Sequence, residues 1–526
     1  MTEPLHPFFA AQQSNGIDWL PNDGQLKTLR DGIFEHGTPP TSARTFKVGP
    51  LTIDLSGHWW NDAIGKAWND TWRAIHTEDH IASLINGDPI NTTEDRPAWH
   101  TALRTAAPSE AITDVHTAMA NAYTQLRQAP PSGQTITDIV NIGVGGSDLG
   151  PCMVERALRP LHPEAPNVHF ISNVDGTPLA SLLPTLNPAT TVFIICSKTF
   201  TTLETMTNFQ SVREWMKEHE LSDETIGHHL YAATSNVAAA NALAISDERI
   251  FPMWDWVGGR YSVWSSIGLS LVLAYGFEVF EQLLAGAYEM DSHFANAKIE
   301  DNLPLQLAAL DAWYGNYFGA QSLAVIPYES SLALLPDYLQ QLMMESNGKC
   351  TTRQGEPVRW RTGQIIWGGV GTNTQHSFHQ LLHQGTQLIP VDFFIGLRPQ
   401  LPLGEHHTHL VANCLAQTEA LAAGDTPSIE QDPLAPFKAI AGHKPFTLFH
   451  YDQLDARTLG AIVALYEHRV FSQSLLWDIL PFDQWGVELG KGISRSLTPA
   501  LQSATEANVP ERLKPFLGQW HKQEHN

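Results

Sequence analysis

The feature that most constrains the fold of this 526-residue chain is a repeated alternation of strand-like and helix-like segments. Between about residues 110 and 275, short apolar runs predict strands. The segments between them, such as residues 203–217, show the apolar spacing of three or four that predicts helices. Such alternation implies a parallel sheet covered by helices on both faces. The strands expected in this part are residues 136–142, 168–173, 192–196, 230–234 and 249–251.

A second series of the same kind runs from about residue 320 to residue 500. The strands expected there are residues 323–327, 365–367, 388–394 and 446–449. The helices expected there are residues 332–344, 374–384, 409–421 and 458–471. The fold class predicted is therefore α/β, with two doubly wound parallel-sheet domains and with helical extensions at the N-terminus and the C-terminus.

The first hundred residues show mixed helical and loop patterns, with a hairpin expected at residues 45–54 that turns at Gly49-Pro50. Because this region has little apolar core of its own, we expect it to pack on the second sheet. The expected division is an N-terminal segment of residues 1–105, a smaller domain of residues 106–280, and a larger domain of residues 281–526 with a helical tail. The longest apolar stretch, residues 261–277, contains serines and glycines and favours a buried helix over a membrane span.

A glycine-rich turn follows the first of these strands. Residues 141–150 read Asn-Ile-Gly-Val-Gly-Gly-Ser-Asp-Leu-Gly, so the strand is expected to enter a turn that opens a helix. Glycine lets the backbone approach an anion closely, and the amides at a helix start point toward it. The strand at 192–196 is followed by Ser197-Lys198-Thr199-Phe200-Thr201-Thr202, which supplies one ammonium and four hydroxyls. Two such loops at the carboxyl ends of parallel strands predict a cradle for a small phosphorylated ligand.

Two other interpretations of the glycine turn stay open. A dinucleotide-binding fingerprint needs a third glycine where Asp148 stands, and an Asp there would repel a pyrophosphate. Asp175 is a candidate ribose-binding acid, but it lies about 30 residues on rather than about 20. The turn is also compatible with a purely structural role, although the hydroxyl-rich loop at residues 197–202 weakens that interpretation.

The charge balance makes the cations informative. A formal net charge of −24 disfavours nucleic acids and anionic membranes as partners. A negative protein that binds phosphate must gather its cations locally, and Lys198, Arg260, Lys349 and Lys491 each lie beside glycine or hydroxyl residues. Taken singly, each of them is equally compatible with a solvated surface cation.

The cysteines and the N-terminal residues bear on the cellular compartment in which the protein is expected. The four cysteines, Cys152, Cys196, Cys350 and Cys414, show no CxxC or Cys/His zinc spacing and no disulfide framework. The first residues, Met-Thr-Glu-Pro, lack the positive region of a signal peptide. We therefore expect a reducing cytoplasm.

Further segments carry candidate catalytic groups. Arg260 follows two glycines and suits a phosphate or a developing oxyanion. Glu345 follows Met343 and Met344, whose apolar side chains are expected to raise its pKa toward that of a general base, although a lone Glu more often caps or pairs at a helix end. Residues 368–376 form a second glycine loop, and residues 482–491 end on a lysine. His376, His379 and His383 are spaced to share one helix face, which would permit a metal site, but no Glu-x-x-His or carboxylate cluster lies near them.

Together, these motifs resemble those of the phosphoglucose isomerase family. Its two signature segments are matched across residues 255–268 and in a segment that ends at Lys491. The segments 143–151, 197–204, 341–349 and 371–386 match as well, and the similarity covers most of residues 88–495. The resemblance implies two α/β domains of the sugar-isomerase (SIS) type.

The resemblance also implies a reaction, which is the interconversion of glucose 6-phosphate and fructose 6-phosphate through a cis-enediol in glycolysis and gluconeogenesis, without metal or other cofactor. It implies Glu345 as the base between C1 and C2, and Arg260 as the cation that stabilises the enediolate. It implies His376 and Lys491 as ring-opening residues, and a homodimer in which His376 enters the neighbouring subunit's site. The substrate-binding positions that it implies are Gly146, Ser147, Ser197, Lys198, Thr199, Thr202, Gln341 and Gln484.

The residues support the same chemistry on their own. Proton abstraction next to a carbonyl needs a base such as Glu345 and a cation such as Arg260 for the oxyanion. A histidine titrates near neutrality and can transfer the protons of ring opening. Two other functions stay open, a sugar-phosphate sensor with the same cradle and a metal-dependent isomerase that uses the three histidines. A sensor would need only the phosphate loops.

Overall fold

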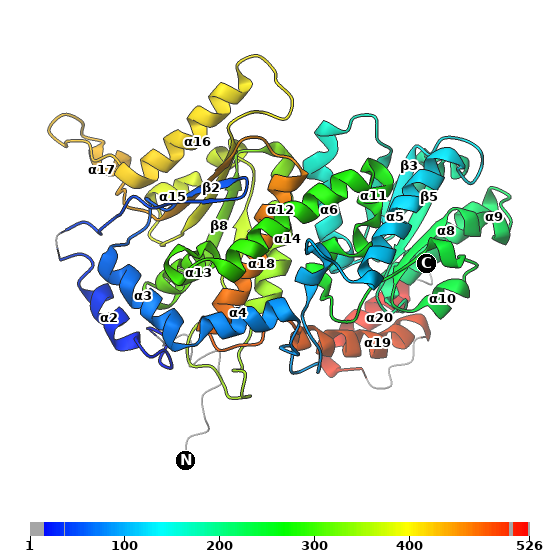
Figure 1. Cartoon of the computed structure of the whole chain (residues 1–526), viewed down its shortest axis with the longest axis horizontal. Coiled ribbons are helices and arrows are strands. Elements are labelled where there is room, and N and C mark those ends of the chain that lie inside the picture. Colours follow the sequence, from blue (N-terminus) through cyan, green and yellow to red (C-terminus); the bar gives the residue numbers. More distant parts are fainter. Residues whose placement is uncertain (1–14, 36, 504–508, 524–526) are drawn as a thin grey trace. The chain divides into compact units, whose positions relative to one another are not determined.

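The structure, a computed structural model, describes residues 15–35, 37–503 and 509–523. The chain forms two compact units, Met1–Pro481 and Phe482–Asn526. The first unit contains a five-stranded sheet and a six-stranded sheet, each largely parallel and accompanied by helices (Figure 1). The predicted α/β class is therefore confirmed.

The five-stranded sheet has the order β4-β3-β5-β6-β7, and all of its strand pairs are parallel. In chain order these strands are 2-1-3-4-5, so the direction of winding reverses between β3 and β5. The strands are β3 (Asp138–Ile142), β4 (Asn167–Ile171), β5 (Thr191–Cys196), β6 (Leu230–Thr234) and β7 (Ile250–Pro252). Ligands of open α/β sheets bind outside the carboxyl ends of the strands at such a reversal.

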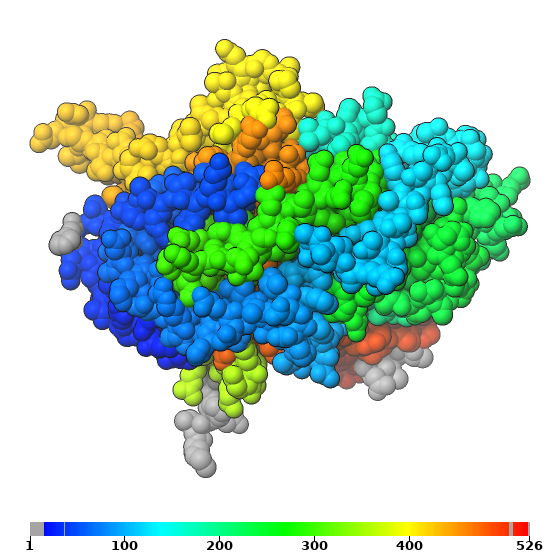
Figure 2. All heavy atoms as spheres, viewed as in Figure 1, coloured from blue at the N-terminus to red at the C-terminus, as the bar shows by residue number. Residues whose placement is uncertain are grey.

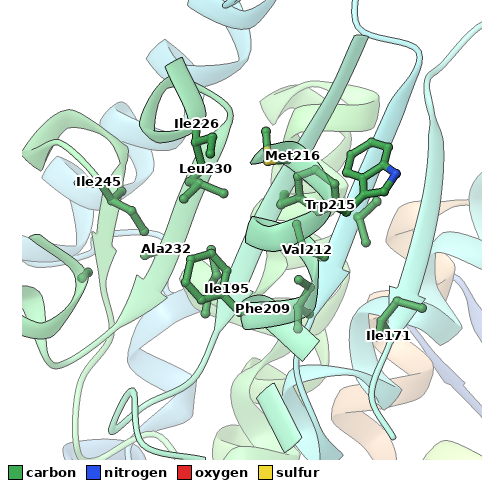
Figure 3. Close-up of a cluster of buried hydrophobic side chains, with 14 of the residues drawn as sticks. Ile171, Ile195, Phe209, Val212, Trp215, Met216, Ile226, Leu230, Ala232 and Ile245 are labelled. Carbon is green, nitrogen blue, oxygen red and sulfur yellow. The ribbon is translucent and has the colours of Figure 1, made fainter. Parts of the chain in front are cut away.

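Helices cover both faces of this sheet. Alternate residues of β3, β5 and β6 join α8 and α9 in one buried cluster, in which Ile195, Phe209, Trp215 and Leu230 pack together (Figure 3). The intervening strand residues are buried as well, on the side that α5 and α11 contact. The helices of this half are α5 (Glu110–Gln128), α6 (Leu149–Leu158), α7 (Thr177–Leu182), α8 (Leu203–Glu218), α9 (Asp223–His228), α10 (Val237–Asn241) and α11 (Leu269–Tyr275).

The six-stranded sheet has the order β1-β2-β11-β10-β8-β9. Its four parallel strands repeat the 2-1-3-4 order of the first sheet. The hairpin β1–β2 turns between Val48 and Leu51, as predicted, and its second strand runs antiparallel to β11. The strands are β1 (Thr45–Val48), β2 (Leu51–Asp54), β8 (Ser322–Pro327), β9 (Ile365–Gly368), β10 (Val391–Gly396) and β11 (Phe446–Tyr451).

The remaining helices of the first unit surround this second sheet. On one face, residues of α15 and α16 join β8 and β10 in a buried cluster. On the other face, Phe394 and Phe449 stack on each other beside Tyr466 of α18. The helices are α2 (Asp23–Asp31), α3 (Asp62–Ala74), α4 (Thr77–Asn86), α12 (Phe277–Asn296), α13 (Leu303–Ala312), α14 (Leu335–Leu339), α15 (His379–Gln384), α16 (His406–Ala423), α17 (Ala435–Lys438) and α18 (Ala456–Leu476).

Helix α18 is the buried centre of the first unit, because nearly every one of its residues is shielded from solvent. It nonetheless carries charges. Arg469 forms ion pairs with Asp311 of α13 and Asp392 of β10, both at 2.6 Å. Glu467 pairs with Arg104, which also binds Asp291 of α12 at 2.7 Å. Buried charges are tolerated only when they are paired and hydrogen-bonded, which these are.

The second unit contains α19 (Glu488–Ser503) and α20 (Lys514–Gln523). Its own small core consists of Ala500, Val509 and Leu517. The indole of Trp520 donates a hydrogen bond to the carbonyl of Leu501, which links the two helices.

Three predicted helices differ from the structure. The apolar stretch at 261–277 is buried, but it forms two 3₁₀ turns and α11 rather than one helix, because the Ser265 side chain accepts the Ile267 amide and Gly276 adopts a φ of 89°. The helix expected at 332–344 begins at Leu335 and becomes π-helical at Gln340. The helix expected at 374–384 begins at His379. In the described part of the chain, no helix is both long and apolar enough to span a bilayer.

Replacing Arg104 by Met tests the buried ion pairs. The change leaves the Asp291 and Glu467 carboxylates without their main cation, so we expect a loss of about 3–5 kcal/mol in unfolding free energy. Urea denaturation followed by circular dichroism measures it. Arg398→Met is the matched control, because the ion pair of Arg398 with Asp452 is largely exposed and should contribute little to stability. Equal losses in the two variants would contradict a central role for the buried network.

Candidate active site

The first loop of the site follows β3. After Ile142 the chain forms the 3₁₀ turn η2 (Gly145–Ser147), and α6 begins at Leu149. Gly145 has a φ of 61°, which favours glycine. A Cβ on Gly146 would lie 1.9 Å from the carbonyl oxygen of Gly259, so a side chain at this position has no room. The predicted strand–turn–helix arrangement is therefore confirmed, and the turn lies directly against the segment that precedes Arg260.

The second loop follows β5, the neighbouring strand. The hydroxyls of Ser197 and Thr202 lie 3.1 Å apart, and the amide of Phe200 donates to Ser197 Oγ. Asn141 of β3 joins the two loops, since its Nδ2 donates to the carbonyl of Ser147 at 3.0 Å and its Oδ1 accepts from the thiol of Cys196 at 3.2 Å. The two loops therefore lie side by side at the reversal of strand order, as the sequence predicts.

Lys198 supplies the ammonium of the second loop. Its Nζ donates to the carbonyl of Asp255 at 2.7 Å, so the chain between β7 and Arg260 holds the side chain in place. Burial and, to a lesser extent, the nearby Arg96 lower the pKa of Lys198 to about 8. Thr199 is exposed, and its hydroxyl lies 2.8 Å from that of Thr201.

An ion pair lies beside the first loop. Arg260 is on the 3₁₀ turn η7 (Gly259–Trp264), and its Nη1 lies 3.2 Å from Oε2 of Glu345. The Arg260 side chain is 1% exposed, whereas that of Glu345 is 26% exposed, so only the carboxylate reaches solvent. The same Glu345 oxygen accepts a hydrogen bond from Gln341 Nε2 at 3.1 Å. A fixed cation and a reachable carboxylate are the groups that proton transfer next to a carbonyl requires.

A π-helical turn carries Glu345. This turn, η12 (Gln340–Glu345), continues α14 and includes Gln341. A Cβ on Gly145 would lie 3.2 Å from Gln341 Nε2, which places the loop after β3 beside the turn that bears Glu345. The π geometry itself was not predicted. Single π turns inside helices occur frequently at functional sites.

The structure brings most of the predicted site residues into one region. The contacts above connect one group, whose members are Gly146, Ser147, Arg260, Gln341 and Glu345. The residues at the adjacent strand end are Ser197, Lys198, Thr199 and Thr202. Gln484 and Lys491 belong to the second unit, where Lys491 is exposed and pairs with Glu488 at 2.7 Å.

His376 stands apart from this group within its own chain. It ends the 3₁₀ turn η13 (Asn373–His376) and is exposed, and among the described residues its side chain has no hydrogen-bond or ion-pair partner. The expected shared helix face of His376, His379 and His383 is wrong, because α15 begins only at His379.

The other two histidines, His379 and His383, share a hydrogen-bond partner, the side chain of Gln417. His379 Nδ1 and His383 Nε2 both contact Oε1 of Gln417, at 3.0 and 2.7 Å. Across the described ranges, no group of three or more His, Cys, Asp or Glu side chains has the arrangement of a metal site.

Two contributors to the site were missed by sequence reasoning. Asn141 links the phosphate loops, and its signal is a polar residue inside an otherwise apolar strand. Ser346 accepts a hydrogen bond from Arg260 Nε at 2.6 Å. Nothing in the local sequence distinguishes Ser346 from any serine at a helix end.

The chain is similar in sequence to proteins of known activity. Residues 54–511 match the family model described as phosphoglucose isomerase. The chain belongs to the phosphoglucose isomerase family. Within this family, the chain is 47% identical over 452 residues to a glucose-6-phosphate isomerase of Chlorobium luteolum, covering 81% of this chain and 82% of that protein. It is 42% identical to a glucose-6-phosphate isomerase of Desulforapulum autotrophicum, with 91% of each chain covered.

A solved structure has the same fold. The crystal structure of a glucose-6-phosphate isomerase from Chlamydia trachomatis superposes with a TM-score of 0.84 at 30% identity. The match covers 96% of this chain and 100% of that chain. The similarity to phosphoglucose isomerases therefore extends over both sheets, and the family expected from the motifs is confirmed.

The low pKa of Lys198 predicts how phosphate binding depends on pH in this family member. Below about 8 the ammonium is charged and attracts phosphate, and the attraction is lost as the pH rises above that value. We expect the dissociation constant of a five-carbon sugar-acid phosphate to rise by up to about tenfold per pH unit above pH 8. Isothermal titration calorimetry measures it. In Lys198→Arg the guanidinium stays charged, so the dependence should disappear; an unchanged pH dependence would assign the effect to another group.

Proposed function

We propose that this protein is a glucose-6-phosphate isomerase, which interconverts glucose 6-phosphate and fructose 6-phosphate in glycolysis and gluconeogenesis. The observation that carries the proposal is the Arg260–Glu345 ion pair beside the two loops of a phosphate cradle. The relatives that match most of the chain bear the name of this activity. The proposed enzyme uses no metal and no other cofactor.

The phosphate anchors the substrate without reacting. In the proposed complex, Ser147, Ser197, Thr199 and Thr202 donate hydroxyl hydrogen bonds to the phosphate oxygens, and Lys198 supplies a positive charge. Gly146 brings the backbone amides of η2 close to the anion. Binding energy from this remote group positions C1 and C2 of the sugar at Glu345.

Glu345 is the proposed base. It takes the proton from C2 of open-chain glucose 6-phosphate, and the electron pair of that bond moves toward the C1 carbonyl oxygen to give the enediolate. Arg260 stabilises the negative oxygen, because its charge is fixed and its side chain is shielded from water. A proton then passes from the C2 hydroxyl to the C1 oxygen, and Glu345 returns the abstracted proton to C1 as the C2 carbonyl forms, which gives open-chain fructose 6-phosphate.

Ring opening precedes this transfer. It requires removal of the proton from the C1 hydroxyl of glucose 6-phosphate and delivery of a proton to the ring oxygen. We assign these steps to His376 and Lys491, since an imidazole can accept or deliver a proton and an ammonium can donate one. Gln341 and Gln484 are the proposed amide contacts of the sugar, and the hydrogen bond of Gln341 to Glu345 also orients the carboxylate.

Replacing Glu345 by Gln tests the base. Gln keeps the shape but cannot accept the proton, so we expect kcat to fall by about 10²- to 10⁴-fold while KM changes little. The assay couples glucose 6-phosphate formed from fructose 6-phosphate to reduction of NADP. Glu329→Gln is the matched control, since Glu329 is a largely buried glutamate whose pKa burial raises to about 7 and which lies after β8, outside the site.

Three outcomes would contradict this proposal. Near-normal turnover of Glu345→Gln would remove Glu345 from the role of base. Wild-type protein that binds the sugar phosphate but does not convert it would favour the sensor. Loss of activity on exhaustive chelation would favour a metal-dependent isomerase.

The working unit that we propose is a homodimer in which His376 enters the partner's site. Its support is the exposed position of His376 and an apolar arm that contains α16 and α17 and extends from the second sheet (Figure 2). The large exposed apolar side chains of this arm are Leu397, Leu401, Leu403, Leu415, Ile429, Leu434 and Phe437. Exposed apolar patches of this kind mark interaction sites.

Mixing two inactive variants tests the shared site. A heterodimer of Glu345→Gln and His376→Ala chains places both defects in one site and leaves the other site intact. With random pairing, we expect recovery of about a quarter of wild-type activity after joint refolding, because half of the dimers are mixed and each has one intact site. Size-exclusion chromatography with light scattering measures the mass. No recovery from an equimolar mixture would place His376 in the site of its own chain.

We further propose two SIS-type domains, residues 106–280 and 281–526, with residues 1–105 packing on the second. The repeated strand order and the pairing of β2 with β11 support this division. The proposed location is the cytoplasm, since all four cysteines are unpaired, as is usual in a reducing compartment.

A further inference from the structure

We propose that Ser346 is a positioning residue, which together with Tyr261 aims the Arg260 guanidinium at Glu345. This inference rests on the proposed function, in which Arg260 stabilises the enediolate. It concerns a residue that does not face the substrate, since Ser346 is fully buried.

Three contacts hold the guanidinium. Its Nε donates to Ser346 Oγ at 2.6 Å, its Nη2 donates to the carbonyl of Pro481, and its Nη1 lies 3.2 Å from Glu345 Oε2. The guanidinium is planar and rigid, so fixing Nε and Nη2 also fixes the direction of Nη1. Ser346 therefore provides one of the two anchors that point the third nitrogen at the carboxylate.

Ser346 is itself held by Tyr261. The phenol oxygen lies 2.9 Å from Ser346 Oγ, and the Tyr261 ring stacks on His100 with a centroid distance of 4.6 Å. Burial raises the pKa of Tyr261, so its hydroxyl stays protonated in the working range. Arginine only donates, so Ser346 Oγ accepts from Nε, and in the contact between Ser346 and Tyr261 either hydroxyl can donate to the other. The backbone is fixed as well, because Tyr338 donates to the carbonyl of Arg260 at 3.3 Å.

A serine that only fills space would not have these partners. Ala would occupy nearly the same volume, but it would remove the hydroxyl that accepts from Arg260 Nε. The guanidinium would then turn toward another acceptor, and Nη1 would move with it. Because the charge stays in the site and only its direction changes, the phosphate cradle should be unaffected.

Steady-state kinetics of Ser346→Ala tests the inference. Hydrogen bonds to charged groups are strong enough that we expect kcat to fall at least about tenfold, with KM for fructose 6-phosphate within about twofold. Tyr261→Phe, which keeps the stacked ring and removes only the hydroxyl, should lower kcat by a smaller factor. Ser474→Ala is the matched control, because Ser474 is equally buried and bonds only the carbonyl of Phe471.

A double variant separates positioning from packing. If Ser346 acts through Arg260, Ser346→Ala should have no further effect on kcat in an Arg260→Ala background. An unchanged kcat in Ser346→Ala, or a full additional loss in the double variant, would overturn the inference. The inference would also be overturned if Ser346→Ala lowered the melting temperature and raised KM by the same amounts as Ser474→Ala does. An inactive wild type would overturn the proposed function as well, whereas an active wild type with a normal Ser346→Ala would overturn only the role of Ser346.

Discussion

The buried ion pairs of α18 are the constraint on which the rest of the first unit depends. Glu467 binds Arg104 and also accepts a hydrogen bond from the indole of Trp264 at 2.8 Å, at the end of the turn that carries Arg260. Charged groups that are shielded from solvent are stable only where each has an opposite charge or a hydrogen-bond partner beside it. The same interaction that fixes helix α18 against its neighbours therefore fixes the base of the turn that presents the site's cation.

Two kinds of contact then assemble the site. The first is topological, since the reversal of strand order places the loops after β3 and β5 side by side. The second is steric, since Gly146 lies against the carbonyl of Gly259 with no room for a side chain. Through these contacts, the sheet fixes the positions of the loops after β3 and β5 relative to the turn that carries Glu345.

Sequence reasoning succeeded where the signal is local. Apolar runs located the strands to within a few residues, and glycine and hydroxyl residues marked the two loops after β3 and β5, because strand burial and turn conformation depend on neighbouring residues. It failed for the separation of His376 from α15 and for the π turn at Glu345, which depend on tertiary packing. Ser346 was missed because its partner, Arg260, lies 86 residues away along the chain.

The π turn at Glu345 has a consequence for the spacing of the side chains that it carries. A π turn holds about one residue more than an α turn of the same span, so it behaves as a single-residue insertion inside a helix. Gln341 and Glu345 are four positions apart in this turn, and the amide donates to the carboxylate. Removing one residue between them would leave them three positions apart, so the two side chains would still share a face but would meet at a different angle. The length of this turn, and not only the identity of its side chains, therefore sets how the amide meets the carboxylate.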